Sequence, residues 1–357
     1  MATIELKKVA KLFGESYAVR PLDLRIGDGE FVALLGPSGC GKTTTLRMIA
    51  GLETTSEGTI AINGQDVTRQ PPSGRDIAMV FQFFALYPHL SVRENIAFPL
   101  KAQGERGDEV GRKVAAVAQL LQIESLLNFK PPELSSGDQQ RVSLARALVR
   151  NPACFLMDEP LGALDADFRE TMRSEIKKLM LSIHGTTVYV THDQIEAMAM
   201  ADRIVVMSQG EVQQIGTPAQ VYHHPKTLFV ARFIGSPGMN LLEGDWIDGA
   251  LHFADDSRYI PPTAWRDVLS GRVVLGFRPE TVIIDPAGQI PGTVFVVDLH
   301  GSYTMAIINC CGLQIHARVD RDSALRVGDQ VRLNLREAGI RFFDPASEKE
   351  LGGGITL

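Results

Sequence analysis

One eight-residue run constrains the fold of this chain more than any other segment. The run is Gly36-Pro37-Ser38-Gly39-Cys40-Gly41-Lys42-Thr43, and it fits the pattern G-x-x-x-x-G-K-[ST]. An apolar stretch at residues 31–35 precedes it and a helical pattern at residues 44–50 follows it. The glycines let backbone N–H groups turn inward around phosphate oxygens, and the helix start adds partial positive charge. The run therefore predicts a nucleotide phosphate site on an α/β fold.

Individual residues of this loop have different predicted roles in binding the nucleotide. Lys42 is expected to bridge the β- and γ-phosphates, and Thr43 to offer its hydroxyl to Mg²⁺. Cys40 lies where a helix start can lower the pKa of a thiol, but without a charged partner it simply fills the loop. The predicted nucleotide-binding residues are Gly36, Pro37, Ser38, Gly39, Cys40, Gly41, Lys42, Thr43 and Thr44.

Short apolar runs and one amphipathic segment extend the α/β prediction. Four runs, at residues 31–35, 77–81, 154–157 and 187–190, each end at a polar or glycine-rich turn, as buried parallel strands do. Residues 166–183 place apolar side chains at the 3.6-residue period of a helix. We expect a doubly wound α/β sheet whose ligand lies at the carboxyl ends of the strands.

An acidic pair, Asp158-Glu159, ends the third of these runs. A parallel sheet would bring both carboxylates to the same edge as the phosphate loop. Asp158 is then placed to hold Mg²⁺ through water, and Glu159 to polarise the attacking water. A strand-end carboxylate in isolation can instead cap the next turn, but its position beside a phosphate loop favours the catalytic interpretation.

The remaining sequence predicts two domains. Residues 92–150 show helical pattern and no convincing strand, so we expect a helical subdomain, about residues 90–150, inserted into the core of a domain spanning residues 1–235. Residues 236–357 contain short alternating stretches separated by Gly, Asp and Pro, which favours an all-β barrel or sandwich. Alternation near the amino end predicts an antiparallel layer from residues 4–8, 22–26 and 59–62.

Composition limits the class of protein. The net charge is −6, and acidic residues outnumber basic ones 16 to 11 in residues 236–357, which argues against a nucleic-acid partner. No stretch approaches the roughly 18 to 20 apolar residues of a membrane span, and the start lacks the apolar region of a signal peptide, so we expect a cytoplasmic protein. Cys40, Cys154, Cys310 and Cys311 show no metal-ligand spacing and are expected to be reduced packing residues.

A run of small and polar residues at 134–141, Leu-Ser-Ser-Gly-Asp-Gln-Gln-Arg, lies between the phosphate loop and the acidic pair. The order of phosphate loop, Gln82, this run, Asp158-Glu159, Leu164-Asp165 and His192 resembles the motif series of the ATP-binding cassette (ABC) transporter ATPases. The run itself is similar to their signature segment, whose backbone donors reach ATP held by a second subunit. The resemblance implies two chains that clamp two ATP molecules, with Mg²⁺, between them.

The resemblance also implies which residues do the chemistry. It assigns catalysis to Glu159, to His192, which would contact the γ-phosphate, and to Gln82, which would sense Mg²⁺ and nearby water. The implied metal ligands are Thr43, Gln82 and Asp158.

Other residues are implied in binding ATP across the subunit interface or at its base. Ser135 and Gly137 would face the γ-phosphate on the second subunit, and Asp165 would cross to the phosphate loop there. Phe13 matches the aromatic residue that stacks on adenine, with Tyr17 as the alternative stacking residue.

The similarity covers nearly the whole chain. Residues 83–92, 233–240 and 276–280 resemble the sugar and glycerol-3-phosphate importer ATPases related to the ATPase of the maltose importer. This implies an OB-like regulatory domain at the carboxyl end, a second ATPase subunit, expected to form a homodimer, two transmembrane permease subunits and an extracytoplasmic solute-binding protein. The protein would then lie peripherally on the cytoplasmic face of the cell membrane. The apolar patch Phe83, Phe84, Leu86 and Tyr87 would accept a permease helix, or would instead be plain core packing.

Two segments depart from the family pattern. In place of Leu-Ser-Gly-Gly-Gln the chain carries Ser136 third and Asp138 fifth, and Gly162-Ala163 replaces the usual Ser-Asn before Leu164-Asp165. Asp138 favours a helix start but is expected to repel ATP across the interface by roughly 1 to 4 kcal/mol. We therefore expect weaker ATP-driven closure or slower turnover than in relatives with Gln.

Two other classes of P-loop protein are alternatives. A soluble ABC ATPase without permeases would normally carry two cassettes or a long coiled-coil insertion, and neither is visible. A small-molecule P-loop kinase would lack the signature run. The solute stays open among a sugar, a sugar oligomer, glycerol-3-phosphate and a related phosphodiester.

Overall fold

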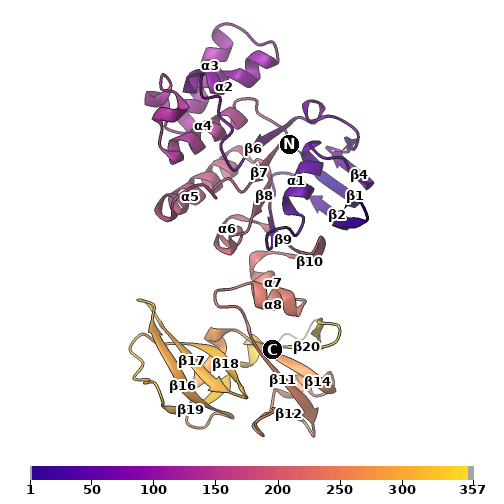
Figure 1. The fold of residues 1–357 in the computed structure, drawn as a ribbon, viewed down its shortest axis with the longest axis vertical. Helices are drawn as coiled ribbons and strands as arrows, with labels where there is room; N and C mark the ends of the chain where they lie inside the picture. The colour runs from indigo at the N-terminus through magenta and orange to yellow at the C-terminus, as the bar shows by residue number, and fades with distance from the viewer. Residues whose placement is uncertain (1, 353–357) are drawn as a thin grey trace. The chain divides into compact units, whose positions relative to one another are not determined.

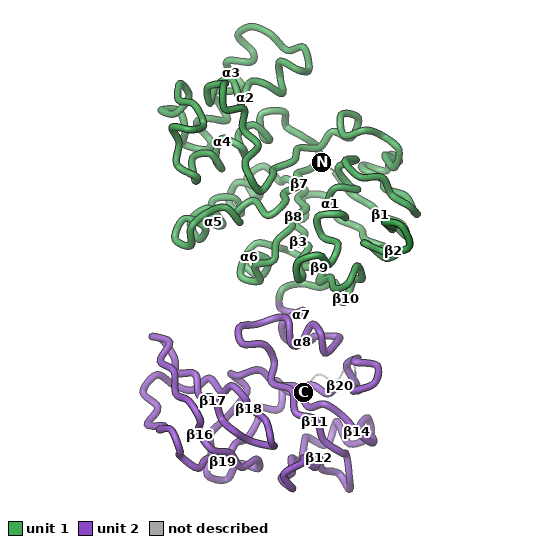
Figure 2. Tube along the Cα trace, in the orientation of Figure 1, with its two compact units in different colours: residues 1–218 green, residues 219–357 purple. Residues whose placement is uncertain are grey.

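A computed structural model describes residues 2–352 of the chain (Figure 1). The chain forms two compact units, Met1–Pro218 and Ala219–Leu357, which Figure 2 colours separately. The first compact unit ends at Pro218. The sequence places the domain boundary later, after residue 235, and that boundary stays a prediction. Among residues 2–352, no helix combines the length and the apolar character needed to cross a bilayer.

A six-stranded sheet in the order β10-β9-β3-β8-β7-β6 forms the centre of the first unit. Five of its strands run parallel, and β10 pairs antiparallel with β9 at one edge. The predicted α/β core is confirmed, because the apolar runs become buried strands. The strands are β3 (Phe31–Leu35), β6 (Ile77–Val80), β7 (Cys154–Asp158), β8 (Thr186–Thr191), β9 (Arg203–Ser208) and β10 (Glu211–Gly216).

An antiparallel layer near the amino end covers one side of this core. Its strand order is β2-β1-β4-β5, with β1 (Ile4–Phe13), β2 (Ser16–Ile26), β4 (Glu57–Ile62) and β5 (Gln65–Asp66). One apolar cluster joins this layer, helix α1 (Lys42–Ala50) and the parallel strands, and it includes the fully buried Leu46 and Val190. Helix α5 (Ala166–Ile183) has the predicted bounds, and α6 (Gln194–Met200) follows β8.

The region between β6 and β7 is helical, as the sequence predicts. It contains α2 (Val92–Ala102), α3 (Asp108–Leu120) and α4 (Ser136–Leu148), which gather apart from the antiparallel layer in Figure 1. Helix α2 begins with a reciprocal capping box, in which Ser91 and Glu94 each accept the other's backbone N–H. Helix α4 begins at the signature run, because Ser135 supplies its N-cap.

The second unit consists mainly of antiparallel strands. They form a six-stranded sheet, β13-β12-β11-β14-β20-β21, and a five-stranded sheet, β15-β19-β16-β17-β18, around one apolar core. The all-β prediction is therefore confirmed, although two short helices, α7 (Pro218–His223) and α8 (Leu228–Phe233), precede the strands. The strands are β11 (Asn240–Ile247), β12 (Ala250–His252), β13 (Arg258–Tyr259), β14 (Gly271–Phe277), β15 (Val282–Ile284), β16 (Ile290–Leu299), β17 (Thr304–Cys310), β18 (Leu313–Val319), β19 (Gln330–Leu335), β20 (Ile340–Phe343) and β21 (Glu350–Leu351).

A buried arginine holds the carboxyl end of α1. Arg75 is 3% exposed and donates to the carbonyl oxygens of Met48 at 2.7 Å and Ile49 at 2.9 Å. The same side chain donates to the carbonyl oxygens of Gln70 and Thr68. The last carbonyls of a helix have no partner within it, and the guanidinium gives Ile49 O a charged donor and Met48 O a second donor beside the Gly51 N–H.

Replacing Arg75 tests this arrangement. We expect Arg75→Ala to lower the free energy of unfolding of the first unit by about 2 to 4 kcal/mol, because buried carbonyls lose charged donors. Arg75→Lys should recover only part of the loss, since an ammonium cannot reach all four oxygens. Urea unfolding followed by circular dichroism measures both, and the exposed Arg69→Ala should change the value by under about 0.5 kcal/mol. Equal midpoints for Arg75→Ala and wild type would contradict the clamp.

Candidate functional site

The register of the parallel sheet gathers the predicted site residues at one edge. Strands β3 and β8 pair Leu35 with Thr191, and β7 and β8 pair Asp158 with Val190. These residues lie at or next to the carboxyl ends of their strands. The phosphate loop, the acidic pair and His192 therefore begin side by side, where an α/β sheet binds its ligand.

Two glycines of the phosphate loop are required by close packing. A Cβ on Gly36 would lie 2.2 Å from the carbonyl oxygen of Met207, and one on Gly41 would lie 2.6 Å from that of Ala18. Gly41 also has a φ of 102°, which favours glycine, and it precedes the first residue of α1. The loop can thus turn its backbone N–H groups toward an anion at the helix start.

Lys42 folds back over the loop that carries it. Its Nζ donates to the carbonyl oxygens of Gly36 at 2.7 Å and Pro37 at 2.9 Å, and the residue is 5% exposed. A buried ammonium held at the start of a helix fits an anionic ligand. Burial raises the pKa of the nearby Cys40 thiol, although Lys42 opposes the shift, so Cys40 acts as a packing residue in the loop.

Thr43 and Asp158 offer two hard oxygen ligands beside the loop. The Thr43 hydroxyl donates to Asp158 Oδ1 at 3.0 Å. Burial raises the pKa of Asp158, with the Thr43 hydrogen bond opposing that effect, so a bound cation would stabilise the charged carboxylate. Mg²⁺ commonly takes one or two protein oxygens together with phosphate oxygens and water. The donor set therefore fits Mg²⁺ held with ATP.

Glu159 brings the other predicted catalytic residues together. Its Oε2 accepts a hydrogen bond from Gln82 Nε2 at 3.3 Å and lies 3.3 Å from His192 Nδ1. Glu159 adopts a left-handed backbone conformation, with φ of 44°, and its N–H donates to Val190 O at 3.0 Å. This turn directs the carboxylate toward the residues that follow β6 and β8, which sequence spacing alone cannot show.

The signature run forms the first turn of α4. The hydroxyl of Ser135 accepts from the Asp138 backbone N–H at 3.2 Å and donates to Asp138 Oδ2 at 2.7 Å. Arg141 lies 3.6 Å from the other carboxylate oxygen of Asp138. A Cβ on Gly137 would lie 2.0 Å from the ring of Phe168 on α5, so only glycine fits there. The charge of Asp138 is thus partly neutralised within the chain.

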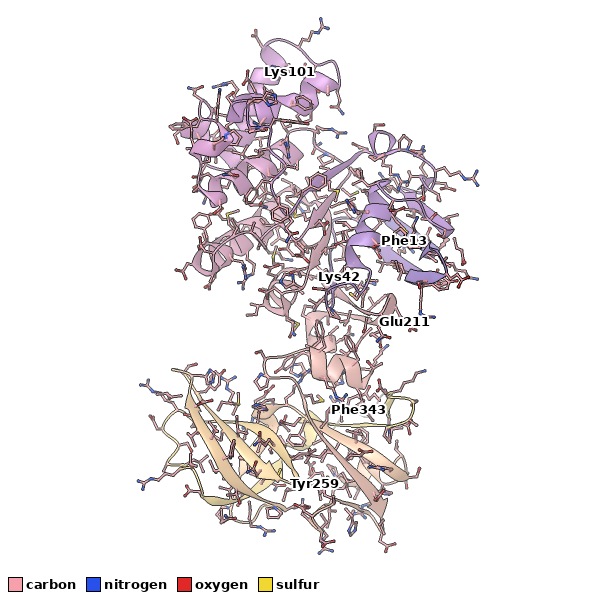
Figure 3. All side chains as sticks on the ribbon, viewed as in Figure 1. Phe13, Lys42, Lys101, Glu211, Tyr259 and Phe343 are labelled. Atoms are coloured by element: carbon pink, nitrogen blue, oxygen red, sulfur yellow. The ribbon has the colours of Figure 1, made fainter. Side chains whose placement is uncertain are left out.

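Asp165 and the two candidate adenine-stacking residues lie on the surface. Asp165 caps α5, because its Oδ1 accepts from the Phe168 backbone N–H at 2.9 Å. Phe13 is 55% exposed at the end of β1, and Figure 3 shows it on the antiparallel layer, with Lys42 at the start of α1. Tyr17 is 38% exposed and its hydroxyl donates to Glu57, so Phe13 offers the more exposed ring, although Lys11 Nζ lies 5.0 Å from its centroid.

Glu196 supports the site although no sequence motif marks it. Glu196 is 3% exposed and accepts from the hydroxyls of Thr191 at 2.6 Å and Tyr189 at 2.9 Å. It therefore anchors the strand end that carries His192, and burial raises its pKa. The only sequence sign of this role is a glutamate four residues beyond His192, on a short helix.

Arg169 links two loops of the site. Its Nη2 donates to Leu164 O at 3.0 Å, and its Nη1 lies 3.9 Å from Asp193 Oδ2. Asp165 and His192, the neighbours of these two residues, are both predicted site residues. One side chain of α5 thereby couples their positions.

Comparison with known proteins decides the family. The ABC transporter family model matches residues 19–162, and the TOBE domain model matches residues 275–343. The trehalose/maltose import ATP-binding protein MalK of Thermococcus litoralis is 46% identical, over 98% of this chain and 100% of the relative. The chain belongs to the ABC transporter family. The sn-glycerol-3-phosphate import ATP-binding protein UgpC of Paraburkholderia xenovorans is 44% identical, over 97% of this chain and 99% of that protein.

Solved structures agree with this assignment. The ATP-binding cassette MJ0796, in a dimeric post-hydrolysis state with ADP and phosphate, matches with a TM-score of 0.54 and 36% identity. The match covers 60% of this chain and 98% of the cassette. The resemblance predicted from the motif order is confirmed, and this ABC protein is an ATPase.

The unusual Asp138 provides a test of the signature run. We expect Asp138→Gln to strengthen ATP-driven closure and to raise ATPase turnover in the assembled transporter about fivefold or more, because it removes a negative charge and releases the Ser135 hydroxyl. Asp138→Glu keeps the charge and should stay near the wild-type rate. Steady-state ATPase assays check both, and an unchanged rate and ATP affinity for Asp138→Gln would refute the hypothesis.

Proposed function

We propose that this chain is the ATP-hydrolysing subunit of an ABC importer for a sugar or a glycerol-3-phosphate-like solute. The observation that carries the proposal is similarity over essentially the full length, tail included, to relatives named for trehalose/maltose and sn-glycerol-3-phosphate import. The subunit would act at the cytoplasmic face of the cell membrane, with separate permease subunits and an extracytoplasmic solute-binding protein.

The site geometry supports a division of labour in ATP hydrolysis. The phosphate loop and Lys42 hold the phosphates, while Thr43 and Asp158 would hold Mg²⁺, which neutralises charge on the phosphate oxygens. Glu159 accepts a proton from the attacking water as general base. Gln82 and His192, each 3.3 Å from Glu159 Oε2, orient that carboxylate and the groups around the γ-phosphate.

Two copies of the chain are proposed to complete each other's sites. Ser135 is exposed at the start of α4, and Asp165 is exposed at the start of α5, so both can meet a nucleotide on a second subunit. The dimeric form of the MJ0796 cassette supports this arrangement. ATP with Mg²⁺ would hold the two subunits closed, and hydrolysis would remove contacts and allow reopening.

Glu159→Gln tests the catalytic assignment. We expect the ATPase rate to fall about 10²- to 10⁴-fold, because the amide cannot act as a base, while ATP binding is retained. The exposed Glu170→Gln on α5 loses the same charge away from the site and should keep the wild-type rate. Phosphate release and nucleotide-binding assays measure the two properties. A Glu159→Gln variant with more than about a tenth of the wild-type rate would rule out this role.

The apolar loop after Gln82 is the proposed contact with a permease. Phe83 is 77% exposed, so the core-packing interpretation fails for this residue. Tyr87, in contrast, packs on Phe98 with ring centroids 4.6 Å apart. Arg146 of α4 donates to the carbonyl oxygens of Phe84 at 2.9 Å and Ala85 at 2.6 Å, which fixes the loop that presents Phe83.

Phe83→Ala tests this contact without disturbing the packed part of the loop. We expect less permease to copurify and transport to drop severalfold, because a strongly exposed apolar ring is lost. Leu181→Ala on α5, 59% exposed, is the matched control and should leave both unchanged. If permeases copurify with Phe83→Ala at wild-type yield and transport stays coupled, the contact lies elsewhere. If no membrane protein copurifies with wild type, a soluble ABC ATPase is the better description.

A further inference from the structure

A buried lysine lies behind the exposed aromatic ring at the end of β1. Lys11 is 8% exposed, whereas Phe13, two residues later, is 55% exposed. Residues two apart on a strand point to the same face. Accordingly, Lys11 Nζ lies over the Phe13 ring, 5.0 Å from its centroid. One face of the ring therefore carries a cation, and a base that stacks on Phe13 takes the opposite face.

All three donors of the Lys11 ammonium are occupied. It donates to Glu53 Oε1 at 2.6 Å, to the carbonyl oxygen of Thr54 at 2.9 Å and to the Thr54 hydroxyl at 3.3 Å. An ammonium has three N–H donors, so none remains for a phosphate of the nucleotide. The hydrogen bond from Lys11 also lowers the pKa of Glu53, which keeps this carboxylate charged. These contacts fix the ammonium in its place behind the ring.

The strand register carries this pair to the nucleotide site. Strands β1 and β2 pair Lys11 with Val19. A Cβ on Gly41 of the phosphate loop would lie 3.1 Å from Cγ2 of Val19, so β2 packs directly on that loop. The hydrogen-bonded strand pair therefore holds the Phe13 ring at a fixed place relative to the loop that binds the phosphates.

We propose that Lys11 is a positioning residue for the base of ATP, because it holds the Phe13 ring ready for stacking. This inference rests on ATP binding in the proposed function and on the expected stacking of adenine on Phe13. A cation over one face of an aromatic ring attracts that ring. A ring that is already held in its binding position loses less conformational freedom when the base arrives. Lys11 acts through Phe13, so its effect depends on both the ring and the base.

A double-mutant cycle tests this role by calorimetric titration of the full-length chain with ATP, without Mg²⁺ so that no hydrolysis occurs. We expect Lys11→Met, which removes the ammonium and keeps the unbranched side chain, to weaken ATP binding about fivefold. In a Phe13→Ala chain the same substitution should weaken binding by less than about 1.5-fold, because no ring remains to be held. Lys7→Met is the matched control, since Lys7 is a 65% exposed cation on the same strand, paired with Glu5, and this variant should bind ATP like wild type.

Inorganic tripolyphosphate separates support of the ring from binding of phosphate. It carries no base, so wild type, Lys11→Met and Phe13→Ala should bind it equally. Lys11→Arg keeps a cation that can stack on the ring, and it should bind ATP within about twofold of wild type. This conservative variant decides the question if Lys11→Met misfolds and loses tripolyphosphate binding.

Four results would overturn the proposal. They are equal losses of ATP affinity from Lys11→Met with and without the Phe13 ring, an unchanged ATP affinity in Phe13→Ala, weaker tripolyphosphate binding by a Lys11→Met chain with wild-type circular dichroism, and a loss above about fivefold in a Lys11→Arg chain that still binds tripolyphosphate. None of them bears on Glu159, whose substitution tests the proposed hydrolysis. Failure of this inference is therefore distinguishable from failure of the proposed function.

Discussion

The hydrogen-bond ladder between β3, β8 and β7 is the interaction on which the nucleotide site depends. It sets Leu35 beside Thr191 and Asp158 beside Val190, so three segments far apart in sequence leave the sheet at one edge. A slip of one residue would turn every side chain of a strand to the opposite face and separate the loops. Each residue of β3 is buried, so a slip would exchange side chains of different size within two closely packed faces.

The ladder alone does not aim Glu159, and local backbone strain completes the site. A left-handed conformation at a non-glycine residue costs roughly 1 to 3 kcal/mol. Here the Glu159 N–H donates to Val190 O, and its carbonyl accepts from the Gly162 N–H at 3.0 Å, so both hydrogen bonds hold the unfavourable turn. The carboxylate then meets Gln82 and His192. The protein thus stores strain at the residue proposed to act on water.

Sequence patterns predicted the elements whose residues share one environment. Residues 154–157 and 187–190 are apolar because both faces of their strands are buried, and residues 166–183 follow one helical stripe with its capping Asp165. The contacts that need tertiary structure were not predictable. Arg75 and Glu196 are charged residues that are buried because the folded chain brings carbonyl or hydroxyl groups to them. Strands β12, β13 and β15 are only two or three residues long, too short to show an alternating pattern.

The loop after Gln82 lies between the proposed catalytic residues and the proposed permease contact, and hydrogen bonds hold it at both ends. At one end Gln82 donates to Glu159, and at the other end Arg146 binds the carbonyls of Phe84 and Ala85. Both of these residues have positive φ, so the loop is bent between its two anchors. Arg146 belongs to α4, whose first turn carries the signature run. Under the proposed function, a load on the exposed loop would act on the carboxylate proposed to polarise water and on the signature helix together, which is what coupling of transport to hydrolysis requires.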